Sequence, residues 1–175
     1  TILDKHESIR IAQREGRAKD SSDHTQESLV KMLALGGEGA FMDRLKEINL
    51  MPVAISYEYD TNDYLKAKEF LLRRRDPDCK KSQLDDLVSM ETGLLQFKGK
   101  VHFQLTPRIN ARIDQIGDFR DVNTAAKYVC LLIDQAIHRS YEIFVINYVA
   151  YDMLNGGTRF ARKSTDAQRD AVAAY

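Results

Sequence analysis

A short apolar stretch at residues 51–59 (MPVAISYEY) constrains the fold of this chain more than any other part of its sequence. Its apolar first half and alternating second half predict a mostly buried strand. Residues 9–13 (IRIAQ) alternate apolar and polar side chains, which predicts an earlier, half-buried strand. Apolar residues at helical spacing in residues 29–33 and 41–48 predict two helices between these strands. Because strands separated by short helices are typical of parallel sheets, we expect an α/β fold with a mainly parallel sheet flanked by helices.

The remaining sequence continues this alternation of elements. Helical patterns occupy residues 62–75 and the stretch after Ser82, which is placed to form a capping box with Asp85. Residues 100–105 alternate and predict a strand near a sheet edge. From residue 122 to residue 151 the apolar positions keep a helical period, which predicts one long amphipathic helix toward the C-terminus.

The length and composition indicate one domain. The chain has 175 residues, of which 43% are hydrophobic, so it has enough apolar material for one compact core. After Gly157 the composition shifts to Thr, Arg, Ser, Asp and Ala. We therefore expect one α/β domain over residues 1–157 and a polar, alanine-containing tail over residues 158–175.

The charge balance and the cysteines exclude several classes of protein. Lys and Arg number 26, as do Asp and Glu, so no overall basic field favours nucleic acid as a partner. Cys79 and Cys130 lie far apart with no CxxC motif, which excludes a disulfide framework and a cysteine zinc site. No apolar run approaches the roughly 18 residues that cross a bilayer, and the first residues do not resemble a signal peptide. We expect a cytoplasmic protein, with peripheral contact to the inner face of a membrane as an open alternative.

Residues 14–19 (REGRAK) are the most unusual part of the sequence, because three cationic side chains, a carboxylate and a glycine come directly after the strand predicted at residues 9–13. Glycine lets the backbone approach a ligand, and guanidinium groups bind phosphate through two parallel hydrogen bonds. These residue types predict a phosphate-recognition loop. The alternative is a charged surface turn with internal ion pairs.

Residues 14–19, together with MPVAISYE at residues 51–58, resemble the third and fourth sequence blocks of the glycerolipid acyltransferase superfamily. This superfamily contains glycerol-3-phosphate and 1-acylglycerol-3-phosphate acyltransferases. The resemblance covers residues 9–60. In one register residues 16–19 (GRAK) match a Gly-Arg-Ser-Arg form of the third block, and in a second register residues 15–16 match the family's Glu-Gly.

The resemblance implies a site on this chain for the acceptor of the acyl group. The residues that would hold the acceptor's phosphate are Glu15, Gly16, Arg17 and Lys19. The residues that would shape the site are Arg14, Pro52, Tyr57 and Glu58.

The resemblance also implies a reaction, acyl transfer from a thioester to a hydroxyl of a glycerol-phosphate or related lipid-precursor acceptor. Acyl-CoA or acyl carrier protein would be the co-substrate, without a further cofactor. Family members carry a histidine, four residues and an aspartate, which act as general base and orienting carboxylate. No histidine here has an aspartate five positions later, so no catalytic residue is identified. We expect the chain to begin downstream of this dyad. The alternative is a noncatalytic anion-binding or interaction domain on the same scaffold.

Two further features bear on ligands. No pair of histidines, or of histidine and carboxylate, shows the spacing of metal ligands, so we expect no metal site. Residues 73–75 are three consecutive arginines at the end of a predicted helix. They are suited to contact lipid headgroups, or they form a solvated helix end that the helix dipole favours.

Overall fold

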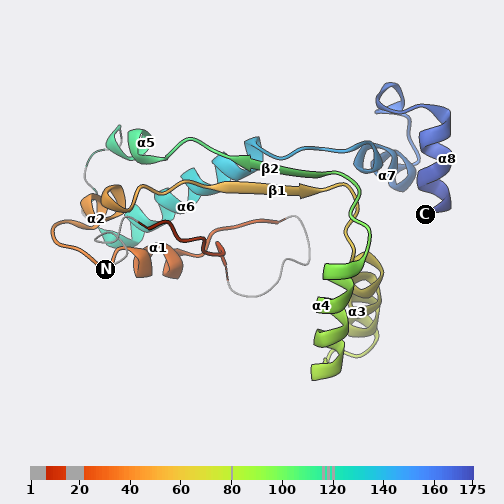
Figure 1. Ribbon diagram of the computed structural model, residues 1–175, viewed down its shortest axis with the longest axis horizontal. Coiled ribbons are helices and arrows are strands. Elements are labelled where there is room, and N and C mark those ends of the chain that lie inside the picture. Colours follow the sequence, from red (N-terminus) through yellow and green to blue (C-terminus); the bar gives the residue numbers. More distant parts are fainter. Residues whose placement is uncertain (1–6, 15–21, 80, 116, 118, 120) are drawn as a thin grey trace. The chain divides into compact units, whose positions relative to one another are not determined.

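The computed structural model describes residues 7–14, 22–79, 81–115, 117, 119 and 121–175. Within these residues the protein is mostly helical, with eight α-helices, 55% helix and one two-stranded antiparallel sheet (Figure 1). The expected α/β fold with a mainly parallel sheet is therefore wrong.

The described chain begins with two short helices, passes through a strand, two longer helices and a second strand, and ends in helices. In chain order the elements are α1 (Glu27–Leu33), α2 (Phe41–Ile48), β1 (Val53–Tyr57), α3 (Asp63–Arg75), α4 (Gln83–Leu95), β2 (Val101–Leu105), α5 (Asn110–Asp114), α6 (Val122–Arg139), α7 (Val145–Asn155), η1 (Ala161–Lys163) and α8 (Asp166–Ala174).

The strands β1 and β2 pair as the arms of a hairpin whose connection contains α3 and α4. At one end of the pair the backbone N–H of Thr106 donates to the carbonyl oxygen of Pro52 at 3.0 Å. At the other end the N–H of Glu58 donates to the carbonyl oxygen of Lys100 at 2.9 Å. The start of one strand thus faces the end of the other, which is the antiparallel arrangement. The strand predictions in residues 51–59 and 100–105 are confirmed, but not the parallel neighbours expected for them.

Residues 9–13 do not form the predicted strand. Ile9 and Ile11 are 55% and 47% exposed, so no apolar surface covers them. Alternation of apolar and polar residues shows which side chains share a face. A strand also needs a second strand that pairs with its backbone N–H and C=O groups. Within the described residues β1 takes β2 as that partner.

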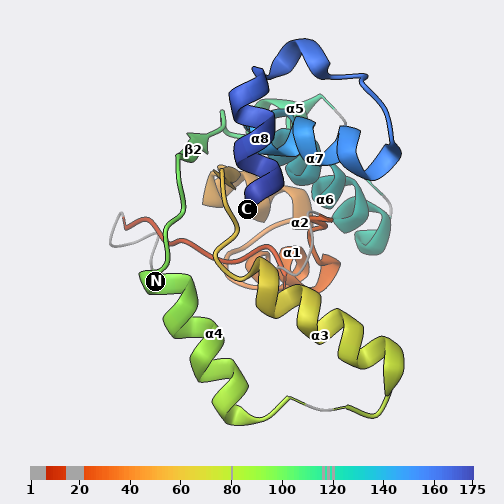
Figure 2. The same ribbon diagram turned by 90° about the vertical axis from the view of Figure 1, so that its right-hand side faces the viewer.

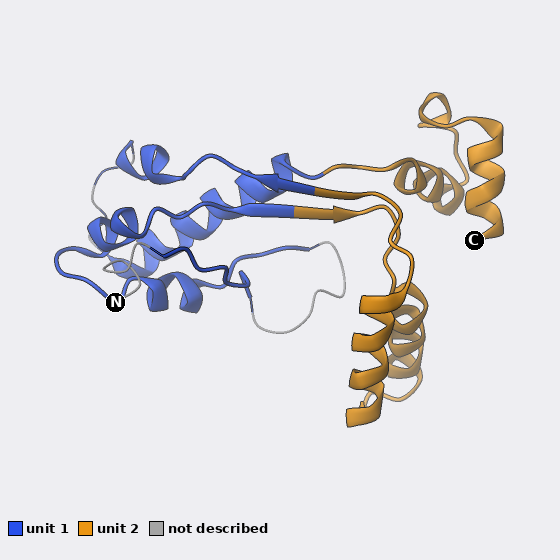
Figure 3. Cartoon of the chain, viewed as in Figure 1, with its two compact units in different colours: residues 1–54, 103–141 blue, residues 55–102, 142–175 orange. Residues whose placement is uncertain are grey.

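The chain divides into two compact units, and each is described by itself (Figure 3). Unit 1 contains residues 1–54 and 103–141, and unit 2 contains residues 55–102 and 142–175. The division passes through β1 and β2, so each strand contributes residues to both units. The domain boundary expected after residue 157 stays a prediction.

The core of unit 1 lies between α1, α2, α5 and α6. Val30 of α1, Leu45 of α2 and Val129 of α6 are fully buried in it. Burying an aliphatic side chain of this size contributes about 1.5–3 kcal/mol. The apolar face of α6 therefore holds α1 in place, and α1 is the first helix after the REGRAK segment.

The long helix expected over residues 122–151 is two helices, α6 and α7. α6 ends at Ser140, and α7 starts after Phe144, whose backbone N–H donates to the side-chain oxygen of Asn147 at 2.9 Å. Ile137 and Phe144 are both buried and lie seven residues apart, which equals two helical turns. The apolar period therefore continues across the break, and periodicity alone does not reveal it.

One local prediction, the capping box, is confirmed. The capping box of α4 forms, because Ser82 accepts a hydrogen bond from the N–H of Asp85 and the Asp85 carboxylate accepts one from the N–H of Ser82. The hydrogen bonds from Ser82 lower the pKa of Asp85. α2 ends at Asn49, which adopts the left-handed conformation of a C-cap.

In unit 2 the helices differ in their packing. Phe160 lies against the rings of Tyr148 and Tyr151 in α7, with ring centroids 5.1 and 5.3 Å apart. By contrast, α3 and α4 have no buried residue and stand as two separate helices (Figure 2). No helix in the described part of the chain is long and apolar enough to cross a membrane.

Glu58 and Gly99 close one end of the β1–β2 pair. The Oε2 atom of Glu58 accepts a hydrogen bond from the N–H of Lys100 at 2.9 Å. Gly99 has φ +61°, in the left-handed region, and a Cβ atom there would lie 2.7 Å from Glu58 Oε2 and from Tyr59 Cδ2. Glycine at this position thus lets the Glu58 carboxylate bind the opposite strand.

Gly99→Ala should lower the free energy of unfolding by about 2 kcal/mol or more, because the methyl group meets Glu58 and the backbone conformation disfavours a side chain. Urea denaturation followed by circular dichroism measures this loss. Gly36→Ala is the matched control, since a Cβ atom there meets nothing within 4 Å. Equal stabilities of the two variants would contradict the role of Gly99.

Candidate functional site

The four residues predicted to hold the acceptor's phosphate, Glu15, Gly16, Arg17 and Lys19, lie outside the described residues. Their role therefore stays a prediction. The structure does describe residues 7–14 on one side of them and the chain from residue 22 on the other, and these flanking residues define the candidate site.

A backbone hydrogen bond joins the two sides of the REGRAK segment. The N–H of Gln26 donates to the carbonyl oxygen of Gln13 at 3.0 Å. Gln26 is also the residue from which α1 starts. Gln13 and Gln26, one on each side of the segment, are thereby held together at the beginning of a helix. We call residues 14–25, which connect these two positions along the chain, the REGRAK loop.

Asp134 of α6 fixes the C-terminal side of this loop. Its Oδ1 atom accepts hydrogen bonds from both the backbone N–H and the hydroxyl of Thr25, at 2.8 and 2.6 Å. Thr25 is buried, so both donors find their partner away from water. Hydrogen bonds to a charged acceptor contribute about 1.5–3 kcal/mol, and Asp134 accepts two.

Tyr141 and His138 hold Asp23, two residues earlier in the loop. The Tyr141 hydroxyl donates to the Asp23 carboxylate, and the Nε2 atom of His138 lies 3.0 Å from the Asp23 carbonyl oxygen. Asp134 and His138 are four residues apart on α6 and Tyr141 comes three residues later, so one side of this region faces the loop. We call Asp23, Thr25, Asp134, His138 and Tyr141 the loop anchor.

The loop anchor keeps Tyr141 protonated. Burial raises the pKa of Tyr141 most, and the hydrogen bond to Asp23 and the charges of Asp23 and Asp134 raise it further. The charge of Arg14 acts in the opposite direction, which places this first residue of the REGRAK segment within electrostatic reach of Tyr141. Tyr141 is therefore a fixed hydrogen-bond donor at neutral pH.

His24 lies beside the loop anchor. Its Nδ1 atom is 3.6 Å from Asp134 Oδ2, and its ring centroid is 6.3 Å from that of His138. This separation allows ion pairing when His24 is protonated, but it exceeds the length of a direct hydrogen bond. Within the described residues no three histidine, cysteine, aspartate or glutamate side chains are grouped closely enough to hold a metal ion.

Cys130 lies one turn before Asp134 on α6 and is the buried thiol of this region. Burial raises its pKa to about 11, and the charges of Asp134 and Glu27 act in the same direction. A thiol with this pKa is almost entirely protonated at neutral pH, whereas the thiolate is the nucleophile. Cys130 is therefore unsuited to carry an acyl group as a thioester.

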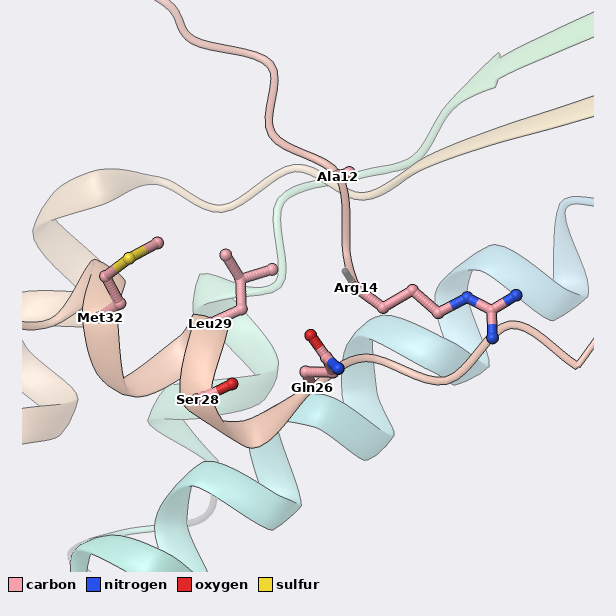
Figure 4. Close-up of a pocket in the computed structure, with 6 residues that line it drawn as sticks. All are labelled: Ala12, Arg14, Gln26, Ser28, Leu29 and Met32. Carbon is pink, nitrogen blue, oxygen red and sulfur yellow. The ribbon is translucent and has the colours of Figure 1, made fainter. Parts of the chain in front are cut away.

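A small hollow of about 230 Å³ lies beside the loop in unit 1 (Figure 4). Leu29 and Met32 of α1 form its apolar side. The side chain of Arg14 extends away from these two residues, with its guanidinium group at the far side of Gln26 (Figure 4). The hollow therefore has an apolar side, and the guanidinium group lies away from that side. Its lining residues are Ala12, Arg14, Gln26, Ser28, Leu29 and Met32.

The residues predicted to shape the site have different surroundings. Pro52 is buried in unit 1, and its carbonyl oxygen accepts hydrogen bonds from the N–H and the hydroxyl of Thr106 at 3.0 and 2.9 Å. Tyr57 and Glu58 belong to unit 2, where Tyr57 is exposed and Glu58 binds the N–H of Lys100. Arg14 and Pro52 therefore share a unit, and the observed contacts of Pro52 and Glu58 stabilise the sheet.

The sequence pattern did not reveal the loop anchor. Thr25 and Asp134 are 109 residues apart, and Asp23 and Tyr141 are 118 apart. One signal was present, because Asp134 is the only acidic residue of α6 and interrupts its apolar surface. A lone carboxylate on the core side of a helix needs a hydrogen-bond partner, but the sequence does not say which.

Comparisons with protein-family models, with curated proteins and with solved structures gave no match. The family assignment therefore remains a prediction from residues 9–60. The structure joins Gln13 to Gln26 and Thr25 to Asp134 of α6, beside the position of the third sequence block.

Asp134→Ala should lower the free energy of unfolding by about 2–4 kcal/mol, because both donors of Thr25 lose their acceptor in a buried place. Hydrogen exchange at the Thr25 amide should accelerate more than exchange in α8. Glu38→Ala, at an exposed position, is the control. Unchanged protection of Thr25 in Asp134→Ala would remove Asp134 from the loop anchor.

Tyr141→Phe should change how stability depends on alkaline pH. The folded-state pKa of Tyr141 is raised, so its contribution is complete below the unfolded-state pKa of about 10 and is lost as pH rises through the higher folded-state value. Denaturation midpoints of the unmodified chain should therefore fall above about pH 10. Tyr141→Phe should be less stable at pH 8 and show a shallower alkaline fall, whereas the exposed Tyr64→Phe should keep the original profile. Parallel profiles for all three proteins would contradict this account.

Proposed function

We propose that this chain is the acceptor-binding part of an acyltransferase that moves a fatty acyl group from an acyl thioester to a hydroxyl of a glycerol-phosphate or related lipid-precursor acceptor. The observation that carries the proposal is the REGRAK segment, whose residue types suit a phosphate and whose two sides are joined by the Gln26–Gln13 hydrogen bond. Fixing the ends of a binding loop lowers the entropy lost when a ligand orders it.

The proposed reaction needs a binding site for the acceptor and a base that takes its proton. No residue of this chain is assigned as that base. In the reaction the acceptor hydroxyl attacks the thioester carbonyl, its proton passes to a base, the C–S bond breaks and the thiol leaves. Arg17 and Lys19 would neutralise the acceptor's phosphate, and Gly16 would let the backbone approach it. Because the sequence has no histidine with an aspartate five positions later, we assign this chain the binding of the acceptor and not the proton transfer.

The antiparallel pairing of β1 with β2 takes away one argument for this proposal. It removes the parallel sheet that the resemblance implied. The proposal therefore rests on the two sequence blocks and on the hydrogen bond that joins Gln13 to Gln26.

The same antiparallel sheet favours a second candidate, a noncatalytic anion-binding or interaction domain. Both candidates use the REGRAK loop to bind an anion, so anion binding alone does not separate them. They differ in the acyl donor, because only the acyltransferase also uses acyl-CoA or an acylated carrier protein.

Arg17→Lys should weaken binding of glycerol 3-phosphate about ten- to a hundredfold, because lysine cannot reproduce two parallel hydrogen bonds to a phosphate. Isothermal titration calorimetry with the full chain measures the change. Arg162→Lys, an exposed arginine after α7, is the control and should bind as the unmodified chain does. Equal affinities in all three proteins would remove Arg17 from the site and leave the charged-turn interpretation.

Acyl transfer separates the two candidate functions. The protein should transfer radiolabelled acyl groups from acyl-CoA or an acylated carrier protein to glycerol 3-phosphate, and Arg17→Lys should reduce kcat/KM for the acceptor by the same factor as its binding. Binding of glycerol 3-phosphate without transfer from either donor would overturn the acyltransferase and support the noncatalytic domain.

A further inference from the structure

Apolar side chains form an exposed stripe along one side of α4, which we call the α4 face. They are spaced by three, four or seven positions, the spacing that places residues on one side of a helix. Their exposed fractions are 41% to 76%, so nothing in the described part of the chain covers them. The residues of the α4 face are Leu84, Leu87, Val88, Leu94 and Leu95.

The side of α4 that approaches α3 is a different one. The Ser89 hydroxyl donates to Asn62 Oδ1 at 3.3 Å, and a Cβ atom at Gly93 would lie 3.1 Å from Asn62 Nδ2. Ser89 and Gly93 are four positions apart, and helical geometry places them opposite the α4 face. The α4 face is therefore not used for packing on α3.

One carboxylate, that of Glu91, lies in the middle of the α4 face. Glu91 comes three positions after Val88 and three positions before Leu94, so apolar side chains flank it along the helix in both directions. It is exposed, and its carboxylate has no hydrogen-bond or ion-pair partner among the described residues. The centre of the apolar stripe therefore carries a negative charge that the fold does not use.

The lysines on either side of α4 are bound elsewhere. The Nζ atom of Lys81 lies 2.5 Å from the carboxylate of Glu69 in α3. The Nζ atom of Lys98 donates to the carbonyl oxygens of Leu94 and Gln96 at 3.0 and 3.1 Å, which satisfies the end of α4. Neither lysine therefore neutralises the α4 face.

The charge of α4 decides between the possible occupants of this face. The helix (QLDDLVSMETGLL) contains three carboxylates and no lysine or arginine. If the α4 faces of two copies met, two Glu91 carboxylates would be buried and neither helix would supply a cation, which costs free energy. An anionic lipid surface would repel α4, and hydrocarbon would desolvate the charge of Glu91. The occupant must therefore combine an apolar surface with a positive charge.

We propose that the α4 face docks an amphipathic helix of a partner protein, which carries a lysine or arginine in the middle of its apolar side and pairs this cation with Glu91. Helices with apolar residues spaced three and four positions apart pack by placing the side chains of one between those of the other, and charges along the contact select the partner. With 13 residues, α4 is about 20 Å long and offers a contact of about three and a half turns. This docking does not depend on the acyltransferase proposal, because it uses no residue of the REGRAK loop.

Two synthetic peptides of about 18 residues, long enough to form a helix, test the charge pairing. Both carry leucines spaced three and four positions apart, and in the middle of this apolar side one has a lysine and the other a glutamate. Fluorescence anisotropy should show that the full chain binds the lysine peptide at least about tenfold more tightly, because like charges repel at a packed contact.

The charge reversal Glu91→Lys should invert this preference, so that the glutamate peptide binds more tightly. Glu38→Lys, at an exposed position of unit 1, is the matched control and should keep the preference of the unmodified chain. No binding of either peptide, equal affinity for both, or a preference that Glu91→Lys leaves unchanged would overturn the proposal.

The apolar part of the contact is tested by Leu87→Gln. It should weaken binding of the lysine peptide about ten- to a hundredfold, the factor that corresponds to burial of one leucine side chain. Leu154→Gln, at an exposed position of α7, should bind the peptide as the unmodified chain does. Equal loss in both variants, or no loss in Leu87→Gln, would place the peptide away from the α4 face.

Two measurements without peptide test the competing occupants. Sedimentation equilibrium should find the unmodified chain and Leu87→Gln in the same oligomeric state, and a dimer that Leu87→Gln dissociates would assign the α4 face to a second copy. Pelleting with vesicles of phosphatidylcholine and phosphatidylglycerol that Leu87→Gln abolishes would assign it to lipid. Either result would overturn the partner helix. Circular dichroism of each variant verifies that it is folded, as expected for substitutions at exposed positions.

Discussion

The start of α1 depends on one carboxylate, that of Asp134. It receives both hydrogen-bond donors of Thr25, and the Thr25 backbone leads directly into α1. Because both donors are buried, water would not replace Asp134 as their acceptor. Without Asp134 both donors would be left without a hydrogen bond. Packing against the apolar face of α6 does not fix the position of Thr25 along this helix to within one residue. The two hydrogen bonds to Asp134 do. The core thus holds α1 against α6, and Asp134 sets where the loop ends.

Burial has the largest effect on the protonation states near Asp134. It raises the pKa of Cys130 and of Tyr141, and the charge on Asp134 acts in the same direction on both. The nearby thiol and phenol are therefore neutral at neutral pH. The donors of Thr25 and Tyr141 are used by Asp134 and Asp23, so this anchor holds the start of α1 and provides no nucleophile.

The sequence predicted the elements of the fold better than their assembly. The capping box of Ser82 and Asp85 and the strands β1 and β2 result from local chemistry, and the structure contains them. The pairing of β1 could not be predicted, because alternation within residues 9–13 and 100–105 is the same signal in a segment that forms a strand and in one that does not. The break between α6 and α7 was equally hidden, since the two helices continue the apolar period in phase. In the candidate site, residues 14–19 stood out by their composition, whereas the anchor joins positions more than a hundred residues apart.

The exposed face of α4 shows the limit of helical periodicity as a predictor of burial. The same spacing of apolar residues that places α6 in a core also occurs in α4, so periodicity alone predicts burial for both. What separates them is the side that meets a neighbouring helix. In α6 this side includes Ala126 and Val129, which are fully buried in the core with α1 and α2, whereas in α4 the side that meets α3 presents Ser89 and Gly93. Because α4 turns Ser89 and Gly93 toward α3, its leucines stay exposed within the described residues.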